Sequence, residues 1–129
     1  MNLIKLVGSL RYGKQAGGPN HVKACERIGS WFEGHGHKVE YEWVIETPEL
    51  STFNTTFIIP DLFIDDKLLV YIDDEGHDGQ TRVKDRRKDT HALEKGYKVA
   101  RIWQYDALKQ PIDLLIDDIN AQVLRGPFY

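Results

Sequence analysis

Hydrophobic residues recur every three or four positions in two segments of the chain, which is the spacing of one helix face. The first segment predicts a helix over 21–34, with Asn20 as its N-cap and Gly34 at its end. The second predicts a helix over about 112–124. A third segment, 81–95, is compatible with a helix but carries few hydrophobic residues.

Other segments have the patterns of strands. Residues 38–46 alternate between hydrophobic and polar, with Val44 as the exception, which predicts a half-buried strand. Residues 57–64 and 68–72 are almost continuously hydrophobic, as in strands covered on both faces, and the polar residues 65–67 between them predict a hairpin turn. A further strand is predicted over 98–103. The order helix, strand, strand, strand, helix, strand, helix indicates a mixed α/β fold.

Composition limits the class of protein. The chain has 129 residues, which fits a single domain, and 41% of them are hydrophobic and 29% charged, as in ordinary soluble proteins. No hydrophobic run approaches the roughly 20 residues of a membrane span, and the first residues lack the hydrophobic region of a signal peptide. The single cysteine, Cys25, excludes an internal disulfide and fits a reducing compartment. We therefore expect a cytoplasmic protein without a membrane partner.

The distribution of charge changes this picture. A formal net charge of -3 and a pI near 5.9 argue mildly against nucleic-acid binding, because phosphates are contacted by Lys and Arg. However, basic residues gather in one segment, which is either a solvated helix face or a phosphate-binding surface. This basic segment, 82–88, contains Arg82, Lys84, Arg86, Arg87 and Lys88.

Acidic residues gather where the two most hydrophobic strands end. Asp61 follows Pro60 and interrupts a hydrophobic stripe, while Asp73 and Glu75 share one face at the end of the next strand. If the hairpin brings these strand ends together, three carboxylates converge, and a divalent cation would relieve their repulsion. Oxygen ligands suit Mg²⁺ or Mn²⁺. His77, shortly after, is either a loop residue or a general acid or base beside the metal.

Other candidates for chemistry are interpreted as structural. His35 and His37, together with Cys25 or His91, would suggest a transition metal, but their spacing does not match zinc sites and indicates a helix-to-strand turn. Trp103 either packs inside or lies at a substrate edge, and we favour packing.

The strings PDLFI, LLVYIDDEGHD and KDRRKDTHALEKGYKVARIW resemble the PD-(D/E)XK nuclease superfamily. Within it they resemble the branch of the very-short-patch repair (Vsr-like) and EDxHD homing endonucleases. In that branch a helix acid, a Pro-Asp strand, a strand ending in an acid and a histidine, a basic helix and a strand ending in Arg-x-Trp follow in this order. The resemblance covers about residues 22–108. It implies a single nuclease domain over 1–129, with a restriction-endonuclease-like mixed central sheet flanked by helices.

The resemblance also implies roles for individual residues. Glu26 matches the helix acid, Asp61 the metal ligand after proline, Asp73 the acid of the second strand and His77 the histidine that follows. Glu75 stands where the superfamily commonly has lysine. The group that activates water therefore stays open among Glu75, His77 and Lys84.

The implied function is hydrolysis of phosphodiester bonds in DNA by an endonuclease that depends on Mg²⁺ or Mn²⁺. Arg82, Lys84, Arg86 and Arg87 would bind the nucleic-acid backbone. The small domain fits a homodimer or a helper DNA-binding protein, in a bacterial or phage-infected cell. The alternative is a catalytically silent nuclease-fold protein that binds nucleic acid or a protein partner, which the missing lysine and the acidic pI support. A hydrolase of another phosphate ester is less favoured, because no Gly-rich phosphate loop is present.

Overall fold

The computed structural model of the chain describes residues 18–46, 57–74 and 79–125, and for 79–85 it describes the backbone. These residues form a mixed α/β fold. The elements in chain order are α2 (Gly18–Gly34), β1 (Val39–Tyr41), β2 (Ile45–Glu46), β3 (Phe57–Ile58), β4 (Leu62–Ile64), β5 (Leu68–Asp73), α3 (Gly79–Glu94), β6 (Lys98–Trp103), α4 (Gln104–Lys109) and α5 (Ile112–Arg125).

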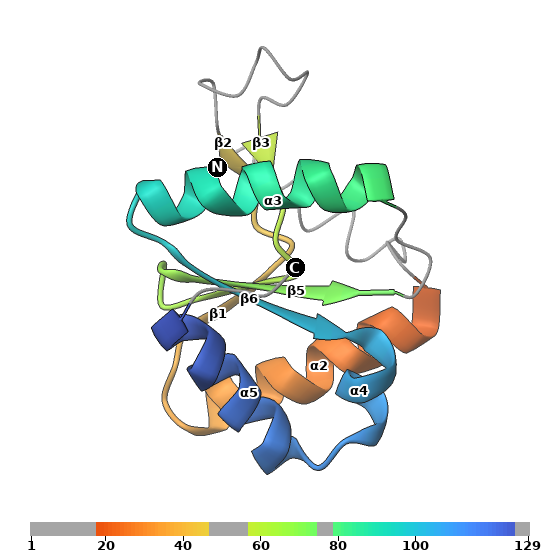
Figure 1. Cartoon of the computed structure of the whole chain (residues 1–129). Helices are drawn as coiled ribbons and strands as arrows, with labels where there is room; N and C mark the ends of the chain where they lie inside the picture. The colour runs from red at the N-terminus through yellow and green to blue at the C-terminus, as the bar shows by residue number, and fades with distance from the viewer. Residues whose placement is uncertain (1–17, 47–56, 75–78, 126–129) are drawn as a thin grey trace.

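The main sheet has four strands in the order β1-β4-β5-β6. The pairs β1–β4 and β4–β5 are antiparallel, and β5–β6 is parallel because α3 crosses over between these strands. Figure 1 shows α3 on one face of this sheet and α2, α4 and α5 on the other. The expected mixed central sheet flanked by helices is therefore confirmed. None of the helices described is long and apolar enough to cross a membrane.

The two faces of the sheet bury separate hydrophobic cores. Leu62 and Val70 pack against α2, α4 and α5, while their neighbours Phe63 and Leu69 pack towards α3. Because successive residues of a strand point to opposite faces, both sets must be hydrophobic. This explains the nearly continuous hydrophobic runs in β4 and β5.

Two of the predicted strands are interrupted, and the interruptions face each other. The strand predicted over 38–46 is divided between β1 and β2, and the one predicted over 57–64 is divided between β3 and β4. Pro60 has no N–H for a ladder, and Glu42 has a left-handed φ of 45°. The Glu42 N–H donates to the Asp61 carbonyl at 3.1 Å, so the two chains leave the main sheet together. They then pair again as the two-stranded sheet β2–β3.

The predicted hairpin is confirmed. Ile64 pairs with Leu68 at the end of the antiparallel β4–β5 ladder. Asp65 and Asp66 turn the chain with left-handed φ values of 53° and 55°, a conformation that Asp tolerates better than most residues. The short turn fixes the register of the two strands that carry Asp61 and Asp73.

The predicted helices are present, with shifted ends. α2 begins at Gly18, before the expected N-cap, and α3 begins at Gly79. Gly96, with a φ of 95°, ends α3 in the conformation that favours glycine. The short helix α4 was not predicted, because six residues are too few to establish a helical period.

Gln122 of α5 completes the edge of β6. Its Oε1 accepts from the Arg101 N–H and its Nε2 donates to the Arg101 carbonyl, both at 2.8 Å. A neighbouring strand would satisfy the same two backbone groups. This buried amide thereby holds the backbone of Arg101 in place.

Candidate functional site

The structure describes some of the predicted site residues and not others. Asp61 and Asp73 are half-buried at one end of the sheet, and Glu26 is exposed on α2. Glu75 and His77 lie outside the described residues, as do the side chains of Arg82 and Lys84.

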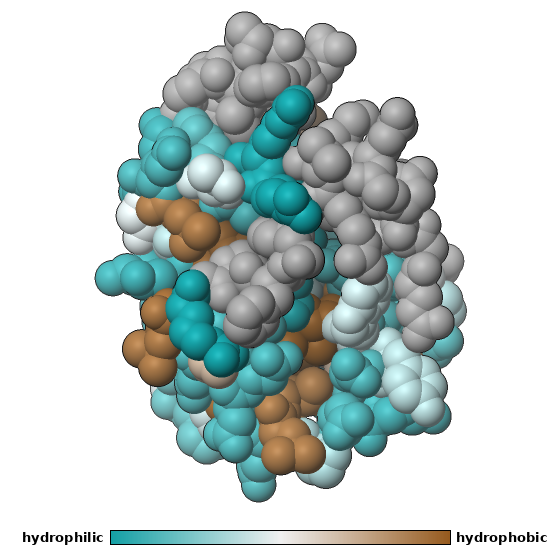
Figure 2. Space-filling model, in the orientation of Figure 1, coloured by the Kyte–Doolittle hydropathy of each residue, from teal (hydrophilic) through white to brown (hydrophobic). Residues whose placement is uncertain are grey.

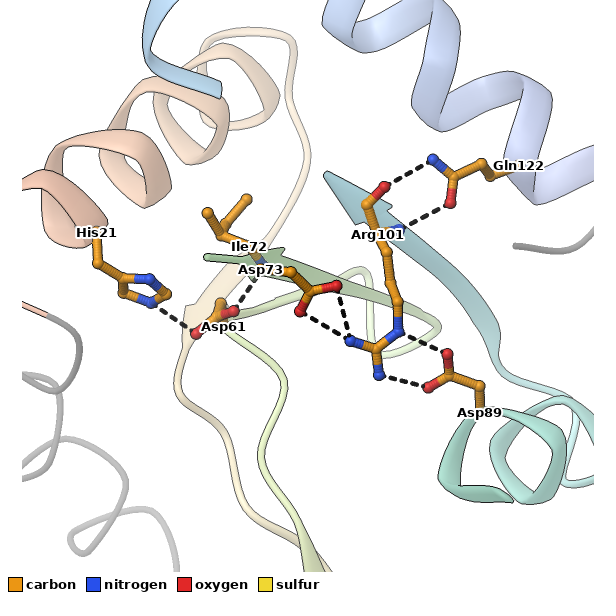
Figure 3. Close-up of polar contacts among 7 residues, drawn as sticks. All are labelled: His21, Asp61, Ile72, Asp73, Asp89, Arg101 and Gln122. Atoms are coloured by element: carbon orange, nitrogen blue, oxygen red, sulfur yellow. Dashed lines mark hydrogen bonds and ion pairs between the residues drawn. The ribbon is translucent and has the colours of Figure 1, made fainter. Parts of the chain in front are cut away.

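Asp61 lies directly before β4, where β5 extends past the start of its partner strand. Its Oδ2 accepts a hydrogen bond from the Ile72 N–H of β5 at 2.7 Å. The carboxylate thus replaces the acceptor that a longer β4 would supply. Its other oxygen, Oδ1, lies 2.8 Å from Nε2 of His21 (Figure 3). One carboxylate therefore joins the end of the sheet to the first turns of α2.

His21, in the first turn of α2, is buried and faces the Asp61 carboxylate. The hydrogen bond to Asp61 raises the pKa of His21, while burial opposes the rise, and the negative charges of Asp61 and Glu42 add to it. A smaller contribution comes from the Gln104 side chain at the start of α4. The pair is thus a charge-assisted interaction whenever His21 is protonated.

Cys25 lies one helical turn after His21, on the same face of α2. Its side chain is fully buried, and burial raises the pKa of its thiol far above the ordinary value. The nearby carboxylates of Asp61, Glu42 and Glu26 act in the same direction. A buried thiol with a raised pKa does not have the environment of an activated nucleophile. One donor atom each from His21, Cys25 and Asp61 lies within 4.8 Å of the others.

Glu42 adds a buried carboxylate to this region. Only 4% of the residue is exposed, and the backbone bend after β1 places it there. Its charge acts on both His21 and Cys25. The interior between α2 and the strand ends therefore holds the acidic side chains of Asp61 and Glu42 next to a hydrophobic core.

Asp73 has a different set of partners from Asp61. Both of its oxygens accept from Arg101 Nη1, at 2.9 and 3.1 Å. The same guanidinium donates to Asp89 of α3 through Nε at 2.7 Å and Nη2 at 2.9 Å, and its carbon lies 4.1 Å from the centre of the Tyr71 ring. Asp89 is almost completely buried. Arg101 thus bridges β5 and α3 on the α3 face of the sheet.

Asp61 and Asp73, which we expected to converge, lie at the same end of the sheet but have different partners. The two residues lie at the same end of neighbouring strands, because Leu62 pairs with Val70. Figure 3 shows the Asp61 carboxylate directed to His21 and the Asp73 carboxylate directed to Arg101. Whether Glu75 joins them lies outside the described residues.

The described part of the basic segment lies on α3. Arg86 and Arg87 are exposed, and Lys88 is half-buried. Hydrophilic side chains cover much of the surface seen in Figure 2. Trp103 pairs in register with Asp73 on the edge strand β6 and is 40% exposed, so the interior packing that we expected for it is wrong.

Sequence reasoning missed several of these residues. His21 and Cys25 are four positions apart, which places them on one helix face, and this spacing was an available signal. Glu42 gave none, because it occupies a polar position of an alternating strand. Arg101 follows hydrophobic strand residues, and a charge in such a strand indicates a buried partner.

Together the fold and the site define a mixed α/β protein with a buried carboxylate–histidine pair at one end of a four-stranded sheet. No family model matches the chain, and neither a curated protein nor a solved structure matches it.

Proposed function

We propose that the protein is a metal-dependent endonuclease of the PD-(D/E)XK type that hydrolyses phosphodiester bonds in DNA. The observation that carries the proposal is the position of Asp61. Its carboxylate is fixed by the Ile72 N–H and by His21, its side chain is still 17% exposed, and it lies beside the end of β5. Directly after β5 the chain continues to Glu75 and His77.

The order of the elements supports the same proposal. α2, the Pro-Asp bend before β4, the acidic end of β5, the basic segment of α3 and the Arg-x-Trp end of β6 follow as in the nucleases that the sequence resembles. The hairpin between β4 and β5 brings the two acidic strand ends to one end of the sheet. This arrangement is the frame on which such nucleases place a metal ion.

In the proposed mechanism, Asp61 would be the principal ligand of Mg²⁺ or Mn²⁺. The bound ion would polarise the scissile phosphate and lower the pKa of a bound water. His21 and the Ile72 N–H hold the Asp61 carboxylate in one orientation. Arg86 and Arg87 on α3, with Arg82 and Lys84, would bind the DNA backbone.

The roles of the residues that would complete the site are also proposed. Glu75, His77 and Lys84 are the candidates for activating water, and Glu26 is proposed to support the site from α2. Asp73 is proposed as a second ligand, which would require one of its oxygens to turn from Arg101 to the ion.

A second candidate is favoured by the contacts of Asp73. Because both of its oxygens face Arg101, Asp73 serves as a structural anchor in this arrangement. A nuclease fold with a single metal-binding carboxylate would bind nucleic acid or a protein partner without cleaving DNA. This is the catalytically silent alternative.

An incubation of the purified protein with supercoiled plasmid separates the two candidates. The endonuclease proposal expects nicked and linear DNA with Mg²⁺ or Mn²⁺ and none with EDTA. Asp61→Asn, which keeps the size of the side chain, should abolish cleavage, and the matched variant Asp117→Asn on an exposed part of α5 should cleave like the wild type.

Absence of cleavage on duplex, branched and single-stranded DNA would contradict the endonuclease proposal. If the same preparation still binds labelled DNA, the silent binding protein is the better account. Equal cleavage by wild type and Asp61→Asn would remove Asp61 from the metal site.

A further inference from the structure

The group formed by His21, Cys25 and Asp61 brings together three different kinds of donor atom. An imidazole nitrogen, a sulfur and a carboxylate oxygen lie within 4.8 Å of one another. An ion bound at about 2.0–2.3 Å from each donor needs them roughly 3–4 Å apart. Small side-chain movements would therefore place all three around one ion.

The three side chains are already held in position by the fold. His21 and Cys25 project from adjacent turns of α2, and the Ile72 N–H fixes the second oxygen of Asp61. The first oxygen is thereby directed at the helix, 2.8 Å from the His21 ring. Few rotamers have to be ordered when an ion binds.

The surroundings favour a cation. Glu42 is buried nearby, and its charge and those of Asp61 and Glu26 act on Cys25. A divalent ion would add positive charge beside these carboxylates, which is electrostatically favourable. The His21 and Asp61 side chains are 11% and 17% exposed and Cys25 is fully buried, so an ion would have to reach the group from the His21–Asp61 side.

We infer that His21, Cys25 and Asp61 form a binding site for a divalent transition ion of the zinc or cobalt type. Mg²⁺ and Ca²⁺ prefer oxygen donors alone, whereas sulfur and imidazole select softer ions. Three protein ligands leave one position open for water or substrate, the arrangement of catalytic rather than structural zinc sites. On binding, the sulfur forms a bond to the ion and its proton passes to solvent.

This inference does not depend on DNA cleavage, although the two proposals share Asp61. A soft ion bound to Asp61 Oδ1 would occupy the ligand that the nuclease proposal gives to Mg²⁺. Zn²⁺ would then bind the same carboxylate, with His21 and Cys25 as its other ligands. The test below measures metal binding without any nucleic acid.

The test is a titration of the metal-free protein with Co²⁺, followed by absorption. Cys25 is the only cysteine of the chain, so a sulfur-to-cobalt charge-transfer band in the near ultraviolet reports that residue alone. We expect the band to saturate at one equivalent and to disappear when Zn²⁺ displaces Co²⁺. Cys25→Ser should remove the band.

Variants of the other two ligands keep the test decisive if Cys25→Ser does not fold. His21→Gln and Asp61→Asn should each weaken Co²⁺ binding by at least about tenfold. His35→Gln, which changes an exposed histidine stacked on Trp31, should bind like the wild type. Circular dichroism of each variant checks the fold.

Absence of the charge-transfer band in the folded wild type would overturn the inference. A band that persists unchanged in His21→Gln and Asp61→Asn would also overturn it, because Cys25 would then bind cobalt without its proposed partners. A cobalt band in a protein that does not cleave DNA would support this site and remove only the nuclease proposal.

Discussion

At the scale of single residues, Asp61 has one role in the fold and another in the proposed chemistry. Its Oδ2 completes the hydrogen bonding of β5, and its Oδ1 faces His21. Truncation to alanine would leave the Ile72 N–H without its acceptor, at a cost of about 1–3 kcal/mol. Asparagine keeps an acceptor for the Ile72 N–H but loses the charge that pairs with His21, so the folding of Asp61→Asn is verified before cleavage is compared.

The His21–Asp61 pair makes the stability of the protein depend on pH. The folded pKa of His21 is raised above its ordinary value of 6.5 by Asp61 and Glu42. The stabilisation by the protonated form is therefore fully present below about pH 6.5 and is lost as pH rises through the folded pKa. We expect wild type to exceed His21→Gln by about 2 kcal/mol in the free energy of unfolding at pH 6, and by less at pH 8 to 9.

Urea unfolding across this pH range measures the difference. Ser30→Ala, a change on the exposed side of the same helix, should stay parallel to the wild type at every pH. A gap between wild type and His21→Gln that stays constant from pH 6 to 9 would contradict the raised pKa.

Arg101 is predicted to be the most sensitive charged residue for stability. Arg101→Met would leave Asp89, whose side chain is 1% exposed, without the guanidinium that binds both of its oxygens. Removing one partner of a buried pair costs about 3–5 kcal/mol. Thermal or urea unfolding measures the loss.

An exposed ion pair provides the matched control. Lys38→Met breaks the pair with Asp66 on the surface and should cost less than about 1 kcal/mol. Adding Asp89→Asn to Arg101→Met should recover part of the lost stability, because it removes the buried charge. Equal losses for Arg101→Met and Lys38→Met would show that the bridge is not a buried anchor.

At the scale of secondary-structure elements, the sequence predicts the two strand interruptions only in part. Pro60 indicates a break, since it has no N–H for the ladder. Residues 38–46 alternate except at Val44, and nothing at Glu42 itself indicates its left-handed bend. That bend follows from tertiary pairing, because Glu42 must leave the sheet together with Asp61.

The exposed arginines of α3 lead to a prediction on DNA binding. Replacing Arg86 and Arg87 by alanine should weaken binding to all DNA sequences alike and lower the slope of log affinity against log salt by about 2. Lys23→Ala with Lys109→Ala, which removes the same charge from exposed positions on α2 and α4, should leave the slope near that of the wild type. Fluorescence anisotropy over a salt series measures both, and equal slopes for the two pairs would contradict a DNA-binding role for α3.

The sequence and the structure agree best on the whole molecule and least on the site. Hydrophobic patterns depend on burial, and they predicted the order of elements and the hairpin. The partners of Asp61 depend on how α2 packs across the strand ends. No local sequence pattern predicts that packing. We expected the helix to contribute Glu26, but the side chain that contacts Asp61 is His21, and Glu26 is exposed.

We propose that Asp61 binds a metal ion at which DNA is cleaved, and single-turnover cleavage tests this proposal most directly. A labelled duplex is incubated with excess protein while Mg²⁺ is varied, for wild type, Asp61→Asn and Asp117→Asn. We expect a metal-dependent rate for wild type and Asp117→Asn, and a loss of at least about 100-fold for folded Asp61→Asn, since a bound metal contributes several kcal/mol to the transition state. A rate that does not depend on Mg²⁺, or that Asp61→Asn leaves unchanged, would contradict the account.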